Sequence, residues 1–144
     1  MTEQKKKACE FLGSVRAHSK RARRLLEQIE VKRYQLLPGA IRYDKDRVNA
    51  SPRDQMLETF AQIDELERFW QAECAEVTKL TWNVFHAIMQ IPKGPEQTFL
   101  LEYYINQKSM FECSDLLNYS LRHTYRLQKK AIDVFVEVHA DGWN

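Results

Sequence analysis

The fold of this chain is decided by SMFECSDLLNYSLRHTYRLQKK, residues 109–130. Its pattern predicts a short helix, a three-residue turn and a longer basic helix. Ser109 and Ser120 are good N-caps for the two helices, and Asn118 tolerates the left-handed backbone that such a turn requires. This order of elements is typical of a helix-turn-helix, in which the second helix enters the major groove of DNA.

The second of these helices is expected to have a packing side and a basic side. At 100° per residue, the packing side comprises Leu121, Thr124, Leu127, Ala131 and Phe135. The candidate DNA-binding residues are Ser120, Arg122, Tyr125, Arg126, Lys129 and Lys130. Arg122 and Arg126 have the fork geometry for guanine edges or phosphates, Ser120 and Tyr125 suit backbone contacts, and the two lysines suit phosphates. The alternative interpretation is an ordinary solvated helix face.

Upstream, the sequence predicts two long helices joined by a connector at 38–50. The first covers Glu3 to Leu37, but Gly13 weakens its early part, so a well-formed helix is expected only from about Ser14. The second begins at the Ser51-Pro52 capping signal and runs for about 40 residues, or about 60 Å. Its apolar stripe is Met56, Phe60, Ile63, Trp70, Cys74, Val77, Val84, Ile88 and Ile91. Together with Trp82, this stripe is expected to be buried against the first helix or a second copy of the chain.

The expected architecture is all-α: a long helical hairpin over residues 1–91, followed by a helix-turn-helix module over 95–138. A proline- and glycine-rich break at 92–95 separates the two parts, and residues 141–144 read as a frayed tail. No strand-like alternation, internal repeat or low-complexity tract is visible.

Composition and charge limit the classes of function that are expected for this chain. Net charge is +2, but residues 1–50 carry 13 Lys/Arg against 6 Asp/Glu, whereas residues 51–100 carry 4 against 8. The N-terminal cations, Arg16 among them, are a second candidate surface for nucleic acid. Cys9, Cys74 and Cys113 lie far apart and the four histidines are scattered, so we expect no metal site, no cofactor and no enzymatic activity. No apolar run suits a signal peptide or a membrane span, which favours a cytoplasmic protein.

Several motifs resemble a known family. They are LEYYI at 101–105, SMFECS at 109–114, LNYS at 117–120 and TYRL at 124–127, and these resemble a sigma-70 region 4-like helix-turn-helix. Upstream, IRYDKDRV at 41–48 and the Ser51-Pro52 pair, followed by the long helix, resemble the ArpU/RinA-type phage transcriptional regulators. The resemblance implies sequence-specific binding of double-stranded DNA that controls phage late genes, in the nucleoid of a bacterial host cell.

Other interpretations stay open at this stage. RNA polymerase is a candidate partner for the 41–48 connector, although a packed structural loop is the favoured interpretation of this segment. A homodimer would bury the long stripe. The chain also suits a DNA-packaging protein that recognises viral DNA, like a small terminase. A further interpretation belongs to a different functional class, that of a helical adaptor protein that binds no DNA.

Overall fold

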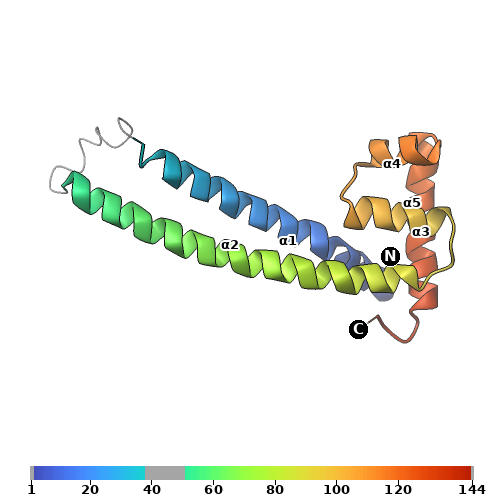
Figure 1. Cartoon of the computed structure of the whole chain (residues 1–144). Helices are drawn as coiled ribbons and strands as arrows, with labels where there is room; N and C mark the ends of the chain where they lie inside the picture. Colours follow the sequence, from blue (N-terminus) through green and yellow to red (C-terminus); the bar gives the residue numbers. More distant parts are fainter. Residues whose placement is uncertain (1, 38–50, 144) are drawn as a thin grey trace. The chain divides into compact units, whose positions relative to one another are not determined.

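The computed structural model describes residues 2–37 and 51–143, and within these ranges the chain is helical and contains no strand (Figure 1). The helices in chain order are α1 (Glu3–Tyr34), α2 (Pro52–Met89), α3 (Pro95–Leu100), the π-helical turn η1 (Leu101–Ile105), α4 (Met110–Leu117) and α5 (Leu121–Val138). The all-α prediction is therefore confirmed. The connector at 38–50, including the 41–48 motif, lies outside the described residues.

The ends of the two long helices differ in part from the prediction. α1 begins at Glu3 rather than near Ser14 and runs through Gly13. The cost of a helical glycine, about 1 kcal/mol, is outweighed because Leu12 and Val15 beside it are buried. α1 ends at Tyr34, whereas the prediction extended it to Leu37. α2 begins where predicted, since the Ser51 hydroxyl accepts a hydrogen bond from the Asp54 backbone N–H at 3.1 Å.

The chain divides into two compact units. The first, which we call the core unit, comprises Met1–Ala17 and Val77–Asn144, and the second, the paired-helix unit, comprises His18–Glu76. The core unit therefore contains the start of α1 and the end of α2 as well as the segment 95–138. Its hydrophobic core consists of Ala8, Leu12, Val15, Val84, Ala87, Ile88, Ile91, Phe99, Leu100, Tyr104, Cys113, Leu127, Ala131, Ile132 and Phe135.

In the paired-helix unit, segments of α1 and α2 lie side by side (Figure 1). Ion pairs join them, with His18 Nδ1 at 2.8 Å from Glu73 Oε2 and Arg33 Nη2 at 2.7 Å from Glu67 Oε1. The buried hydrophobic residues of this unit are Ala22, Ile29 and Ile63. The predicted stripe is wrong at its beginning, because Met56 and Phe60 are 38% and 50% exposed.

Two further expectations are wrong in the core unit. Trp82 does not pack in a helical seam, since it is 63% exposed. The segment after α5 is not a frayed tail in its described part, because Trp143 packs against Phe11 and Phe135 with ring centroids 5.7 and 5.5 Å away. Next to it, the buried His139 places Nε2 2.8 Å from the Ala87 carbonyl oxygen. The ring contacts of Trp143 and the contact of His139 with the Ala87 carbonyl hold this segment against the core.

Candidate nucleic-acid interface

α4 and α5 are connected by a turn with defined backbone geometry. Asn118 has φ 57° and ψ 37°, the left-handed conformation expected for it. The Tyr119 N–H donates to the Ser114 carbonyl at 2.9 Å and the Asn118 N–H to the Asp115 carbonyl at 3.2 Å. This is the hydrogen-bond pattern of a Schellman motif, which satisfies carbonyl groups at a helix end and stops the helix.

Both predicted N-caps are confirmed. The Ser109 hydroxyl accepts a hydrogen bond from the Glu112 N–H, and the Ser120 hydroxyl accepts one from the His123 N–H, each at 3.1 Å. Ser120 thereby fixes the start of α5 immediately after the turn. Because its hydroxyl oxygen has this role, Ser120 sets the position of the helix start from which the basic side chains project.

The packing side of α5 is placed as predicted except at its first residue. Thr124, Leu127, Ala131 and Phe135 are buried. Thr124 is fully buried although it is polar, because its hydroxyl donates to the Ser120 carbonyl at 2.9 Å. Leu121, which was assigned to the packing side, is instead 45% exposed. This assignment is wrong because helical periodicity takes no account of whether a neighbour covers the first turn.

The other predicted residues of α5 lie on its outer side. Arg122, Tyr125, Arg126, Lys129 and Lys130 are all exposed, and at 100° per residue they span an arc of about 140°. Lys130 has an acidic neighbour, with Nζ 3.2 Å from Glu96 Oε1. Within the described part of the chain, no ion pair involves the other three cations. The structure therefore presents Arg122, Arg126 and Lys129 together, with no carboxylate partner among residues 2–37 and 51–143.

Charge along α5 is arranged against the helix dipole. The first turn contains Arg122 and no acid, while Asp133 and Glu137 lie in the second half of the helix. A cation near a helix N-terminus is unfavourable by about 0.3–1 kcal/mol. Helix stability therefore does not explain why the basic residue lies in the first turn of α5 and the acidic residues lie in its second half. The amino-terminal half of α5 combines exposed cationic side chains with the positive end of a helix, and both features attract phosphate.

Arg16, which sequence analysis placed in a second basic surface, has a different role. Its Nη2 donates to the carbonyl oxygens of Tyr103 at 2.7 Å and Lys108 at 3.1 Å. The guanidinium carbon also lies 4.4 Å from the centroid of the Tyr103 ring. Arg16 thus ties α1 to both ends of the segment that leads from η1 into α4. No sequence pattern pointed to this contact, since the partners are backbone carbonyls about 90 residues away.

The segment held by Arg16 contains further local bonds. In η1 the hydrogen bonds span five residues, as between the Asn106 N–H and the Leu101 carbonyl at 3.0 Å. Lys108 Nζ lies 2.7 Å from Glu102 Oε2, and this hydrogen bond lowers the pKa of Glu102. These contacts fix the loop that enters α4 and hence the position of the α4–α5 pair within the core unit.

Metal-ligating and thiol side chains are further candidates for a site within the described part of the chain. They include no group of three His, Cys, Asp or Glu side chains placed to hold a metal ion. Burial raises the pKa of the Cys9 and Cys113 thiols, which keeps them in the protonated, weakly nucleophilic form. None of the described helices is long and apolar enough to cross a membrane.

Comparison with known proteins identifies no relative: the chain matches no protein-family model, no curated protein and no solved structure.

Proposed function

We propose that this protein binds double-stranded DNA sequence-specifically and regulates transcription, with α4 and α5 acting as a helix-turn-helix and residues 120–135 docked in the major groove. The observation that carries the proposal is the basic side of α5: Arg122, Arg126 and Lys129 are exposed, lie on one arc and have no acidic partner among the described residues. A capped helix that follows a tight left-handed turn presents them in the way a recognition helix does.

Each residue then has a distinct role. Arg122 and Arg126, one turn apart, contact base edges or phosphates with their guanidinium forks. Lys129 and Lys130 contact phosphates, which makes binding sensitive to salt. Ser120 and Tyr125 contact the DNA backbone, and Ser120 also caps the start of α5. Phosphate contacts set the register of the helix, whereas base contacts give specificity.

The biological setting rests on the sequence resemblance alone. The resemblance to ArpU/RinA-type regulators favours control of phage late genes in the nucleoid of a bacterial host. In this proposal the two long helices form a hairpin that provides dimerisation or contact with RNA polymerase. The ion pairs between α1 and α2 in the paired-helix unit are consistent with such a hairpin.

The test begins with selection of bound sequences from random double-stranded DNA, followed by affinity measurements over a series of salt concentrations. We expect Arg122→Ala and Arg126→Ala each to cost about 1–3 kcal/mol of binding free energy and to relax preference at one position. Lys129→Ala should weaken binding to all sequences and lower the salt slope by about one. Arg68→Ala, an exposed arginine of α2, is the matched control and should leave affinity unchanged.

The proposal is wrong if selection enriches no sequence, or if both arginine variants bind the selected site as tightly as the unaltered chain. Absence of any salt-dependent binding would instead favour a helical adaptor. If the selected sequence lies at a viral packaging site rather than upstream of a promoter, the packaging role replaces transcriptional control.

A further inference from the structure

A cavity lies between α1, η1 and α5 within the core unit, and we call it the α1–α5 cavity. Its volume is about 510 Å³. Small-molecule sites in proteins usually have volumes of about 300–1,000 Å³. The cavity is lined by Lys5, Cys9, Tyr104, Gln128, Lys129, Ile132 and Asp133. Because these residues come from three elements far apart in sequence, folding of the core unit creates the cavity.

One part of the lining is apolar. Ile132 and Tyr104 are 6% and 7% exposed, and Cys9 is half-buried. The buried hydroxyl of Tyr104 has a partner, because a side-chain hydrogen bond joins it to Gln128. A hydrocarbon group that covers these side chains leaves water, which favours its binding.

The other part of the lining is charged, and its balance is positive. Lys5 Nζ lies 2.6 Å from Asp133 Oδ1, so these two charges compensate each other. Lys129 makes no ion pair with any residue in the described ranges 2–37 and 51–143. The lining therefore has one cation in excess, which a ligand with a single negative charge would balance.

The backbone at Tyr104 also points to a binding role for the cavity. Tyr104 belongs to η1, in which the hydrogen bond from the Asn106 N–H to the Leu101 carbonyl spans five residues. Such π-helical turns are rare, and they occur frequently at functional sites. Within η1, the Tyr103 ring lies 4.4 Å from the Arg16 guanidinium carbon, whereas Tyr104 lines the cavity. Two successive tyrosines thus serve different contacts.

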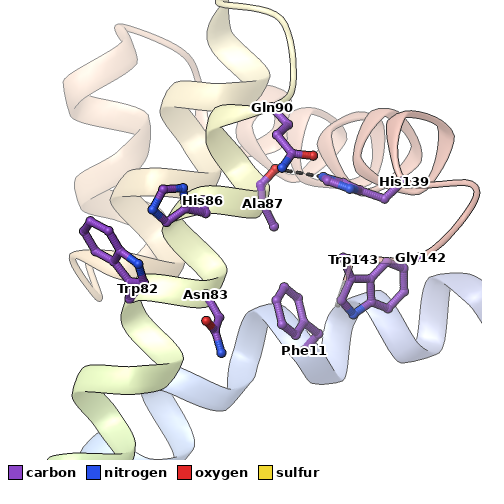
Figure 2. A pocket seen from close by; sticks show the side chains of 9 residues that line it. All are labelled: Phe11, Trp82, Asn83, His86, Ala87, Gln90, His139, Gly142 and Trp143. Atoms are coloured by element: carbon purple, nitrogen blue, oxygen red, sulfur yellow. Dashed lines mark hydrogen bonds between the residues drawn. The ribbon is translucent and has the colours of Figure 1, made fainter.

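A second hollow of the core unit provides a comparison. Figure 2 shows this hollow, which has a volume of about 470 Å³ and includes Phe11, Trp82, His86 and Trp143 in its lining. None of its lining residues is a lysine, arginine, aspartate or glutamate. The two sites are similar in volume but differ in charge, so we expect the α1–α5 cavity to discriminate more strongly between anionic and cationic ligands.

We propose that the α1–α5 cavity binds a small carboxylic acid with an apolar body. The apolar body lies against Cys9, Tyr104 and Ile132, and the carboxylate pairs with the ammonium group of Lys129. A carboxylate matches the single excess charge, whereas a phosphate monoester carries nearly two negative charges. Binding of this ligand is measured without DNA, so the proposal does not depend on the proposed function.

The test is calorimetric titration of the full chain with octanoate, 4-phenylbutanoate and octylammonium. We expect at least one of the two carboxylates to bind with a Kd below about 1 mM. Octylammonium should bind at least about tenfold more weakly, because its charge has the same sign as that of Lys129. The stronger of the two carboxylates shows whether the apolar body is aliphatic or aromatic.

Three variants locate the bound carboxylate. Lys129→Met should weaken its binding about tenfold or more, because the substitution removes the excess cation from the lining. Lys130→Met is the matched control, since this neighbouring exposed lysine does not line the cavity, and it should leave the affinity unchanged. Trp82→Ala alters the hollow of Figure 2 and should also leave the affinity unchanged.

Alkylation by iodoacetamide gives an independent measurement. The bound carboxylate should slow the reaction of Cys9, which lines the cavity. Cys74 lies in the paired-helix unit and should react at the same rate with and without ligand. If Cys9 of the folded chain does not react at all without ligand, the cavity is closed to small molecules and the proposal is wrong.

Four other results would overturn the proposal. The first is no binding of either carboxylate up to about 1 mM. The second is an equal affinity for octylammonium. The third is an equal effect of Lys129→Met and Lys130→Met, or a loss of binding in Trp82→Ala. The fourth is a bound carboxylate that leaves the Cys9 rate unchanged. Because Lys129 is exposed, its variant should retain its helical circular dichroism and melting temperature.

Discussion

Replacing Arg16 by alanine tests whether α1 holds the α4–α5 pair in position. The substitution removes two hydrogen bonds from a charged donor to the carbonyls of Tyr103 and Lys108, together with a cation–π contact. Charge-assisted bonds contribute about 1.5–3 kcal/mol each, and an exposed cation–π contact about 0.5–1 kcal/mol. Since Arg16 is only half-buried and water can reach part of the site, we expect unfolding free energy to fall by about 2–4 kcal/mol.

Two measurements check this expectation. Urea unfolding gives the loss in free energy, and hydrogen exchange locates it, because the Asn106 and Lys108 amides should exchange faster when their segment loosens. Arg23→Ala, at an exposed position of the same helix, is the matched control and should change stability by less than about 0.5 kcal/mol. If the Arg16 variant loses no more stability than the Arg23 variant, the two carbonyl contacts do not hold this segment.

Three further substitutions test the turn, the cap and the core. Asn118→Val should cost about 1–2 kcal/mol of stability because a β-branched residue tolerates φ 57° poorly, whereas Asn118→Gly should be nearly neutral. Thermal unfolding compares the two variants, and equal losses of stability would contradict the argument. Ser120→Ala should cost about 1 kcal/mol through loss of the cap, and Ser120→Asp should restore it, as measured in the same assay. Burial raises the pKa of Tyr104 to about 12, so the stability that the neutral phenol contributes is complete below pH 10 and is lost as the pH rises toward 12. In urea unfolding, Tyr104→Phe should therefore remove up to about 2–3 kcal/mol of the decline in stability at alkaline pH. An unchanged decline in this variant would show that Tyr104 is not its origin.

The parts of the fold that could be predicted from sequence are those that neighbouring residues determine. The two serine caps, the left-handed Asn118 and the buried side of α5 after its first turn depend on residues within a few positions of one another. The same periodicity also predicted that Arg122, Tyr125, Arg126 and Lys129 face outward, and all four side chains are exposed.

The features that were missed depend on contacts between distant segments. Periodicity assigned Leu121 to a packing side, and Trp82 was expected in an interhelical seam, but both side chains are exposed. Trp143 was expected to belong to a frayed tail, yet it packs against Phe11, which lies more than 100 residues earlier in the sequence. Similarly, nothing near Arg16 in sequence shows that its hydrogen-bond partners are carbonyls of residues 103 and 108.

The makeup of the core unit has a consequence for biosynthesis. Leu12 and Val15 leave the ribosome more than 100 residues before Leu127 and Phe135, which belong to the same buried cluster. At typical translation rates, the earlier residues wait on the order of 10 s for the later ones. The apolar side of the nascent α1 therefore stays without its partners from α5 while the intervening residues are synthesised, and the buried cluster is completed only after Phe135 has emerged.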